Sequence, residues 1–188
     1  MQSKIKIAFF DIDGTLLKLG KKIPSEKTVY ALNELKKKGI LLCMATRRSS
    51  LMMPKFEKIN FDVYISFNGS YSFNDKEIIF KCPIPKNDVF QILNNSKRMK
   101  RAISISNEKY TIANGTFNIL ETYFSFGEGK VIVVNDFESK CNDDIYQIML
   151  SCVKSEYDDI LKDTTDSIIT AWWDKGYYTF RFRERKSS

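Results

Sequence analysis

Residues 5–17 read IKIAFFDIDGTLL and decide the fold of this chain. The apolar run that opens the stretch is typical of a buried parallel strand. It ends in two aspartates, Asp11 and Asp13, which are followed by Gly14 and Thr15. Two carboxylates at the end of a buried strand repel each other, and a divalent cation such as Mg²⁺, which prefers oxygen ligands, would supply the counter-charge. The glycine allows a sharp turn and a close approach to a ligand, and the threonine hydroxyl can hold a phosphate oxygen.

The aspartate pair has two other possible interpretations besides a metal site. One is a solvated turn without chemistry, although four fixed residue types recur by chance in a chain of this length only on the order of a few times in a thousand. The other is a calcium-binding EF-hand loop, which begins D-x-D-x-D-G and has Glu at its twelfth position. Counted from Asp11, the fifth position is Thr15 and the twelfth is Lys22, so the EF-hand interpretation fails.

The composition indicates a globular protein, because 43% of the 188 residues are hydrophobic and such a chain can form a core. There is no run of about 18 apolar residues and no signal-peptide pattern, so we expect no membrane partner. The four scattered cysteines form no C-x-x-C pair, which indicates reduced thiols in the cytoplasm. The absence of histidine excludes histidine-based catalytic triads, histidine zinc sites and histidine general bases.

The net charge of +7 raises the question of nucleic-acid binding. The lysines are spread along the chain, however, and the densest basic run, residues 181–186, lies at the end. No recognised nucleic-acid motif is present. We therefore expect a solvated basic surface without a nucleic-acid partner, which would also suit a phosphate-bearing anionic substrate.

The first 82 residues alternate between strand and helix patterns. After the opening strand, the sequence predicts a helix over Pro24–Lys38, a strand over Ile40–Ala45, a second helix near residues 50–58 and a strand over Phe61–Phe67. This order predicts a parallel sheet with right-handed crossovers, and ligands bind such sheets beyond the carboxyl ends of the strands. Each of the three strands ends in polar residues that can contact a ligand: Asp11–Thr15, Thr46–Arg48 and Asn68–Gly69.

The later residues carry a mixed pattern of helices and strands. A hairpin is expected over Tyr71–Phe80, and Pro83 and Pro85 mark a boundary after it. Beyond the boundary we expect an α+β arrangement. Its predicted helices are Lys86–Lys97, Thr116–Phe126 and Ser155–Leu161, and its predicted strands are Ala102–Ser106, Lys109–Ala113, Tyr146–Cys152 and Ser167–Trp173.

The stretch FFDIDGTLL resembles the first motif, DxDGT, of the haloacid dehalogenase-like hydrolases, and it is most similar to their Cof-type branch, mostly sugar-phosphate and related phosphatases. The resemblance implies that Asp11 is the nucleophile that takes the phosphoryl group and that Asp13 is the acid/base acting on the leaving group. It also implies that the Asp11 carboxylate and the Asp13 backbone carbonyl help to bind Mg²⁺. The metal charge would neutralise the anionic phosphate that a weak carboxylate nucleophile must approach.

Two further segments resemble motifs of the same family. Thr46-Arg47-Arg48 is similar to its second motif, usually Thr-Gly-Arg, which implies that Thr46 takes part in catalysis by hydrogen-bonding the transferring phosphoryl group. Arg48 matches the family arginine, while Arg47 replaces the usual glycine. Asn68-Gly69 matches an Asn-Gly pair that lines the cleft, although by itself such a pair is only a turn signal. The expected substrate-binding residues are Gly14, Thr15, Arg48, Asn68 and Gly69.

The resemblance implies an α/β fold in which a Rossmann-like parallel sheet core, incomplete here, carries an inserted α+β cap domain. We place the N-terminal part of the core at residues 1–82, the cap at 83–175 and a basic tail at 176–188. The lysine that the family has after its cap and its Gly-Asp-x-x-Asn-Asp motif find no match in the sequence. We hypothesise that the tail arises from a frameshift, because codons can be chosen for it that continue the family pattern when read one base later.

The resulting hypothesis is a cytoplasmic, Mg²⁺-dependent phosphatase that acts on small phosphorylated metabolites through an aspartyl-phosphate and is impaired by the missing motifs. The alternative is a catalytically inactive, truncated remnant that at most binds phosphate or a partner. That alternative predicts no turnover, together with exposed hydrophobic surface or self-association through the incomplete core.

Overall fold

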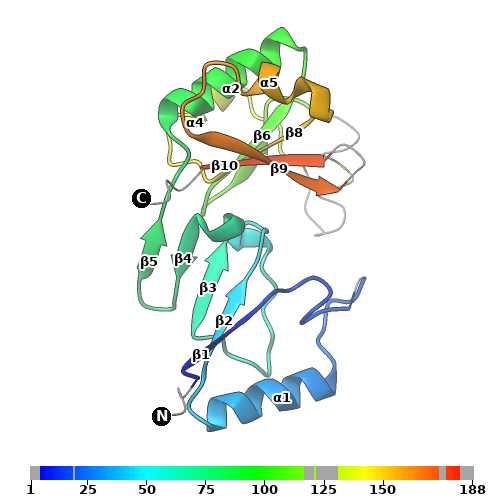
Figure 1. Cartoon of the computed structure of the whole chain (residues 1–188), viewed down its shortest axis with the longest axis vertical. Helices are drawn as coiled ribbons and strands as arrows, with labels where there is room; N and C mark the ends of the chain where they lie inside the picture. The colour runs from blue at the N-terminus through cyan, green and yellow to red at the C-terminus, as the bar shows by residue number, and fades with distance from the viewer. Residues whose placement is uncertain (1–4, 19, 117–120, 122–130, 174–176, 183–188) are drawn as a thin grey trace. The chain divides into compact units, whose positions relative to one another are not determined.

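The structure is a computed structural model that describes residues 5–18, 20–116, 121, 131–173 and 177–182 (Figure 1). The chain divides between Lys81 and Cys82 into two compact units. We call Met1–Lys81 unit 1 and Cys82–Ser188 unit 2, and each is described by itself.

Unit 1 is built on a mixed five-stranded sheet with the strand order β1-β2-β3-β4-β5. The three strands β1, β2 and β3 are parallel, whereas β4 is antiparallel to both β3 and β5. Helix α1, Glu26–Lys37, connects the first two strands, and this arrangement confirms the predicted α/β class. The strands are β1 (Ile7–Phe10), β2 (Leu41–Ala45), β3 (Val63–Ser66), β4 (Tyr71–Phe73) and β5 (Ile78–Lys81).

Helix α1 lies within the predicted range Pro24–Lys38, and residues with known capping tendencies flank it. The Ser25 side chain caps the helix, because its Oγ accepts a hydrogen bond of 3.1 Å from the backbone N–H of Thr28. Leu32 is buried on the side that faces the sheet, within the core of unit 1. Gly39 has φ +75 just after the helix, a conformation that favours glycine at this position.

The helix predicted near residues 50–58 is wrong. The structure has only a single 3₁₀ turn there, η1, Ser50–Met52. Pro54 accounts for the difference, because a proline disfavours the helical conformation of the residue before it. Met53 accordingly lies in the extended region, with φ −75 and ψ 130.

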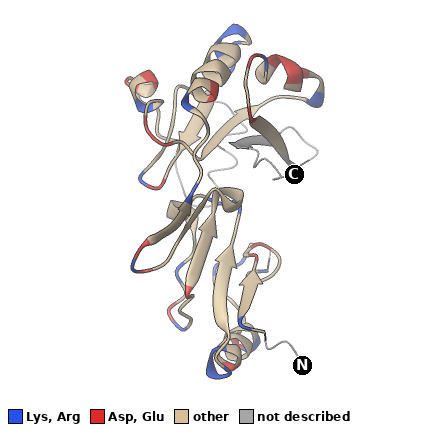
Figure 2. Cartoon of the chain, turned by 60° about the vertical axis from the view of Figure 1, so that its left-hand side comes forward, with Lys and Arg blue, Asp and Glu red and all other residues tan. Residues whose placement is uncertain are grey.

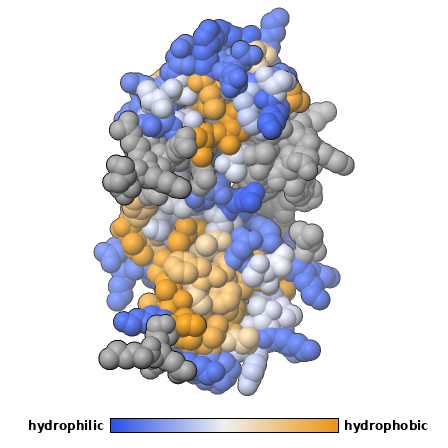
Figure 3. Space-filling view, viewed as in Figure 1, coloured by the Kyte–Doolittle hydropathy of each residue, from blue (hydrophilic) through white to orange (hydrophobic). Residues whose placement is uncertain are grey.

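The two faces of the unit 1 sheet differ in how they are covered. One face packs against α1 and the connecting loops. On the other, the register places Ile7 opposite Leu41 and Phe9 two residues further along β1, so these three side chains share a face. Phe9 is 60% exposed and Leu41 is 49% exposed, and Figure 3 shows a broad apolar area on the surface of unit 1. The buried core on the covered side consists of Ile12, Leu16, Leu17, Leu32, Leu42, Met44, Ile59 and Phe61.

Unit 2 contains a five-stranded sheet with the strand order β7-β6-β8-β10-β9, in which every neighbouring pair is antiparallel. The expected strand and helix patterns are largely present. The strands are β6 (Ile103–Ser106), β7 (Thr111–Ala113), β8 (Gln147–Ser151), β9 (Ser167–Trp173) and β10 (Tyr177–Phe182). The helices are α2 (Lys86–Arg98), α4 (Phe137–Lys140) and α5 (Tyr157–Ile160), with a 3₁₀ turn η3 (Lys154–Glu156) before α5.

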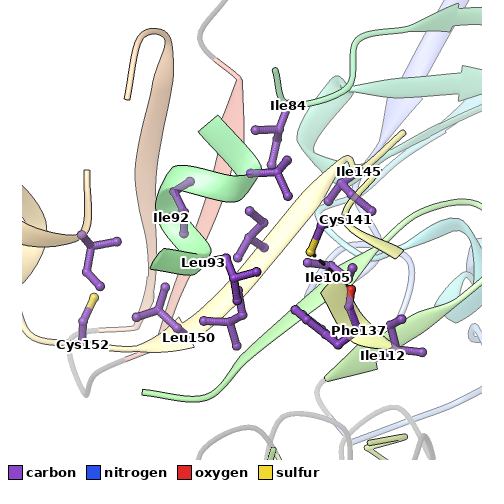
Figure 4. Close-up of a cluster of buried hydrophobic side chains, with 14 residues drawn as sticks. Ile84, Ile92, Leu93, Ile105, Ile112, Phe137, Cys141, Ile145, Leu150 and Cys152 are labelled. Carbon is purple, nitrogen blue, oxygen red and sulfur yellow. Dashed lines mark hydrogen bonds between the residues drawn. The ribbon is translucent and has the colours of Figure 1, made fainter. Parts of the chain in front are cut away.

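The core of unit 2 forms where α2 covers the sheet. Figure 4 shows Ile92 and Leu93 of α2 among side chains that come from the strands, including Ile105 of β6 and Leu150 of β8. Ile92 and Ile105 are completely buried. Burial also raises the pKa of the Cys152 thiol to about 12, which keeps this core cysteine in its neutral form.

Two segments of unit 2 differ from the sequence expectation. The segment expected as a basic tail contributes β10, Tyr177–Phe182, which pairs with both β8 and β9. The run YYTFRF is rich in aromatic residues, which favour strands. Helix α4 was not expected. The helix predicted over Thr116–Phe126 lies largely outside the described residues.

Charged residues lie mainly on the helices and loops, whereas the strands are largely uncharged (Figure 2). Within the described ranges, no helix combines the length and the apolar character that crossing a bilayer requires.

Candidate active site

The three parallel strands of unit 1 bring their carboxyl ends to one edge of the sheet. The register pairs Phe10 with Met44 and Met44 with Tyr64, so the residues that follow these strands emerge side by side. Asp11 directly follows β1 and Thr46 directly follows β2. The common edge expected from the sequence is therefore present.

Backbone hydrogen bonds within residues 11–17 fix the conformation of the DxDGT loop. The Leu16 N–H donates to the Asp11 carbonyl (3.2 Å), the Leu17 N–H donates to the Ile12 carbonyl (2.8 Å), and the Gly14 N–H donates to the Leu17 carbonyl (2.7 Å). Gly14 has φ +84, a conformation that glycine adopts at little cost. The apolar side chains of Ile12, Leu16 and Leu17 anchor the loop in the core. The other residues of the loop are exposed: Asp11, Asp13, Gly14 and Thr15.

The end of β2 holds Thr46 in a buried position. Thr46 is 6% exposed, and its backbone N–H donates to the Ile65 carbonyl at 2.9 Å. Its Oγ1 accepts a hydrogen bond of 3.2 Å from the Arg48 N–H. A hydroxyl that accepts in this way can still donate its own hydrogen, for example to an oxyanion.

Asp13 and Arg48 join the end of β1 to the end of β2. The Arg48 Nε donates to Oδ2 of Asp13 at 3.1 Å, and its Nη2 donates to Oδ1 at 2.6 Å. The third guanidinium nitrogen, Nη1, donates to the Met52 carbonyl at 3.3 Å. The structure thus places Arg48 on the carboxylate for which the family resemblance implies an acid/base role, a pairing that no sequence signal indicated.

The turn that follows β3 has a strained backbone and is hydrogen-bonded to the residues that follow β2. Phe67, Asn68 and Gly69 have φ of 51, 57 and 99, and a positive φ is rare for a bulky residue such as phenylalanine. The Phe67 N–H donates to the Arg48 carbonyl (3.0 Å), and the Asn68 N–H donates to the Thr46 carbonyl (3.2 Å). These bonds hold the strained backbone in place and bring Asn68 and Gly69 against the second motif.

Sequence reasoning missed two contributors to this arrangement. Phe67 is 1% exposed and supplies a backbone N–H, and Met52 supplies the carbonyl that holds Arg48. Neither contact uses a polar side chain, so residue type carries no signal for it.

The side chains available for a metal ion are few. Across the described ranges, no group of three or more His, Cys, Asp or Glu side chains is placed to hold a metal. Magnesium sites, however, commonly use only one or two carboxylates and complete their shell with water and substrate phosphate. An exposed Asp11 carboxylate next to the Asp13 backbone fits that pattern, while the Asp13 side chain is engaged by Arg48.

A sequence profile described as haloacid dehalogenase-like hydrolase matches residues 8–183. A putative phosphatase, YkrA, of Bacillus subtilis (strain 168) is 33% identical over 113 residues, which cover 58% of this chain and 44% of that protein. A putative bifunctional phosphatase/peptidyl-prolyl cis-trans isomerase of Streptococcus pyogenes serotype M6 is 38% identical over 84 residues, covering 44% of this chain and 18% of that protein. The matched segments span less than half the length of either relative.

Solved structures share the fold over almost the whole chain. The sugar phosphatase BT4131 superposes with a TM-score of 0.78 at 23% identity, covering 95% of this chain and 70% of that one. BT1666 from Bacteroides thetaiotaomicron gives a TM-score of 0.80 at 20% identity, with 95% and 67% covered. TM0651 from Thermotoga maritima gives 0.78 at 16% identity, with 96% and 70% covered. Likeness at this level of identity establishes the common architecture.

Proposed function

Because this chain belongs to the haloacid dehalogenase-like hydrolase family, we propose that it hydrolyses phosphate monoesters with Asp11 as the nucleophile. The observation that carries the proposal is the contact between Asp13 and Arg48. It joins the first motif to the second, so that residues 35 positions apart in the sequence form one site.

The proposed reaction has two steps. In the first step Asp13 carries a proton taken up from solvent. An oxygen of the Asp11 carboxylate attacks phosphorus, the bond from phosphorus to the ester oxygen breaks, and Asp13 gives that leaving oxygen its proton. A water molecule then attacks the phosphorus of the aspartyl-phosphate, and Asp13 takes up its proton. Inorganic phosphate leaves, and the Asp11 carboxylate is restored.

The other residues of the site would position the phosphoryl group. The hydroxyl of Thr46 can donate to a phosphoryl oxygen, and the buried position of this side chain restricts where that oxygen lies. Further contacts come from the exposed DxDGT loop and from the turn after β3. The proposed substrate-binding residues are Gly14, Thr15, Arg48, Asn68 and Gly69.

Mg²⁺ is the proposed cofactor. The Asp11 carboxylate and the Asp13 backbone carbonyl would hold it, in keeping with the small number of carboxylates that this ion requires. When bound, the ion would lower the repulsion between the anionic phosphate and the attacking carboxylate.

The proposed substrate is a small phosphorylated metabolite of the sugar-phosphate type. Support comes from the fold shared with a sugar phosphatase and from the net charge of +7, which favours anionic ligands. We also place the reaction in the cytoplasm, since the scattered cysteines suit a reducing compartment. No nucleic acid or membrane is needed as a partner.

A second candidate is a protein that binds phosphate or a partner without turnover. The exposed side chains of Phe9 and Leu41 on one face of the unit 1 sheet favour it, because apolar sheet faces often mark association surfaces. Self-association measured by analytical ultracentrifugation, together with absent turnover, would support this candidate over the phosphatase.

Hydrolysis of p-nitrophenyl phosphate tests the proposed function. We expect release of nitrophenol in the presence of Mg²⁺, loss of the activity on chelation with EDTA, and recovery when Mg²⁺ is restored. Asp11→Asn should reduce the rate to background. Asp75→Asn changes an exposed carboxylate on the hairpin between β4 and β5 and should leave the rate unchanged. Equal activity of Asp11→Asn and the native chain would refute the assignment.

A further inference from the structure

Asp13 and Arg48 face each other through both carboxylate oxygens and two guanidinium nitrogens. We propose that this ion pair is exchangeable: a substrate phosphate takes the guanidinium edge that Asp13 occupies, and Asp13 thereby becomes available to the leaving oxygen. Arg48 would then act as a positioning residue for Asp13 as well as a phosphate contact. This inference rests on the proposed function. It adds that the Asp13 carboxylate and the substrate phosphate compete for the guanidinium of Arg48.

The shape of the contact suits either anion. Arg48 uses Nε and Nη2, which form one edge of the planar guanidinium, to bind two oxygens at 3.1 and 2.6 Å. Carboxylates and phosphates both present two oxygens at a spacing that fits this fork. A phosphate can therefore replace Asp13 without any rearrangement of the arginine.

Arg48 is the fixed partner of the pair. Its backbone N–H donates to Thr46 Oγ1 at 3.2 Å, and its backbone carbonyl accepts from the Phe67 N–H at 3.0 Å. Its Nη1 donates to the Met52 carbonyl at 3.3 Å. The loop after β2 thus holds both the backbone and the side chain of Arg48 in place.

Asp13 is the more loosely held partner. Its side chain is 46% exposed, compared with 21% for Arg48. In the part of the chain that the structure describes, its carboxylate oxygens form hydrogen bonds only with the guanidinium. Exposed ion pairs are weak, so a more highly charged anion can displace the carboxylate.

The role proposed for Asp13 also requires the exchange. As acid/base it must place a carboxyl oxygen beside the leaving oxygen of the substrate, but both of its oxygens face Arg48. A phosphate on the guanidinium edge removes this conflict. Phosphate binding and the release of Asp13 then become one event.

Calorimetric titration with inorganic phosphate, in EDTA so that no metal contributes, tests the exchange without any turnover. Asp13→Asn removes the competing carboxylate and should tighten phosphate binding. Asp11→Asn is the matched control, because it removes one negative charge from the same strand end but leaves the ion pair intact. We expect the tightening in Asp13→Asn to exceed that in Asp11→Asn by about tenfold, the order of effect of one charge-assisted hydrogen bond.

The same titration in an Arg48→Gln background completes a double-mutant cycle. Without the guanidinium, phosphate should bind about tenfold more weakly, and the difference between Asp13→Asn and Asp11→Asn should disappear. Equal effects of the two asparagine variants in the native background would overturn the exchange, and so would a failure of every variant to bind phosphate. Phosphate binding that follows the cycle in a chain without turnover would refute the phosphatase and leave the exchange standing.

An NMR measurement on the native chain tests the exchange even if the Asp13 variants do not fold. The Arg48 Nε–H resonance, assigned by its loss in Arg48→Lys, should shift as phosphate is added. Phosphate binding detected by calorimetry with no change in that resonance would contradict the proposal.

Discussion

Among the residues that the structure describes, the buried core cluster of unit 2 is larger than that of unit 1. In unit 2, α2 packs on an antiparallel sheet, and core residues such as Ile92, Ile105 and Ile148 are fully buried. In unit 1, α1 covers one face of the sheet, and Phe9 on the opposite face is 60% exposed. We therefore expect the loss of a core side chain to cost more in unit 2, whereas in unit 1 backbone hydrogen bonds hold the polar loops at the strand ends.

A buried carboxylate adds to the order of unit 2. Asp88, in the first turn of α2, is 1% exposed and accepts four hydrogen bonds from the segment that leads into β9. Two come from the N–H and hydroxyl of Thr165, one from the Asp166 N–H and one from the Ser167 hydroxyl. Asp88 is therefore a structural clamp, in contrast to the exposed Asp11 and Asp13 of unit 1.

Replacement of one core side chain should give the largest difference in stability between the two units. Ile105→Ala is expected to lower the free energy of unfolding of unit 2 by about 2–5 kcal/mol, because it leaves a cavity in a packed core. Ile79→Ala is the same substitution at a position in β5 that is 50% exposed, and it should change stability by no more than about 0.5 kcal/mol. Urea denaturation, followed by circular dichroism, compares the two variants.

Tryptophan fluorescence reports unit 2 in the same experiment, because both tryptophans of the chain, Trp172 and Trp173, lie in β9. Similar losses from Ile105→Ala and Ile79→Ala would contradict the difference in packing between the units.

Removal of the Asp88 charge should have the next largest effect. Asp88→Asn leaves buried donors without their anionic partner and should cost about 1–3 kcal/mol. Asp158→Asn, at an exposed position of α5, is the control and should stay within about 0.5 kcal/mol of the native chain. Thermal unfolding at pH 7 measures both, and a loss in Asp158→Asn equal to that in Asp88→Asn would argue against the clamp.

The same carboxylate should make unit 2 sensitive to acid. Burial by itself would raise the pKa of Asp88, but the hydrogen bonds from Thr165, Ser167 and Asp166 outweigh it and hold the pKa below the usual 3.8. Its stabilising contribution is complete well above the unfolded pKa and is lost as the pH falls through the lower folded pKa. Melting curves from pH 7 to pH 2 should show a smaller acid-induced loss in Asp88→Asn than in the native chain.

The strained turn after β3 tests how unit 1 holds its polar loops. Asn68 has φ 57, a conformation that asparagine tolerates better than β-branched residues do. Asn68→Val should therefore destabilise unit 1 by about 1–2 kcal/mol, whereas Asn68→Gly should be tolerated. Hydrogen exchange at the amide of residue 68, which bonds to the Thr46 carbonyl, reports this loop directly. Equal protection in both variants would show that the turn carries no strain.

The cap of α1 gives the smallest expected change. Ser25→Ala removes the side-chain acceptor for the Thr28 N–H and should cost about 1 kcal/mol, whereas Ser25→Asp keeps an acceptor and should cost less. Thermal melts of the two variants make the comparison. A loss in Ser25→Asp as large as that in Ser25→Ala would exclude the capping bond as its cause.

The part of the fold that could be predicted follows from local patterns. The apolar strand before Asp11, the helix predicted over Pro24–Lys38 and the polar ends of the strands all carry signals within a few residues. These signals also predicted that the three strand ends meet at one edge, because parallel strands leave no other arrangement.

The features that the sequence did not predict depend on contacts between distant residues or on segments too short to show a pattern. The ion pair between Asp13 and Arg48 spans 35 positions, and a motif resemblance assigns roles without assigning contacts. The helix predicted near residues 50–58 is prevented by Pro54, because a proline disfavours the helical conformation of the residue before it. Helix α4 has four residues, too few to show a period.

Chemical trapping of the phosphorylated aspartate tests the central claim most directly. Borohydride reduces an aspartyl-phosphate to homoserine, and mass spectrometry locates the altered residue. After reaction with p-nitrophenyl phosphate and Mg²⁺, we predict homoserine at position 11 and none at position 13. Homoserine at position 13, or turnover with no homoserine at either position, would contradict the account.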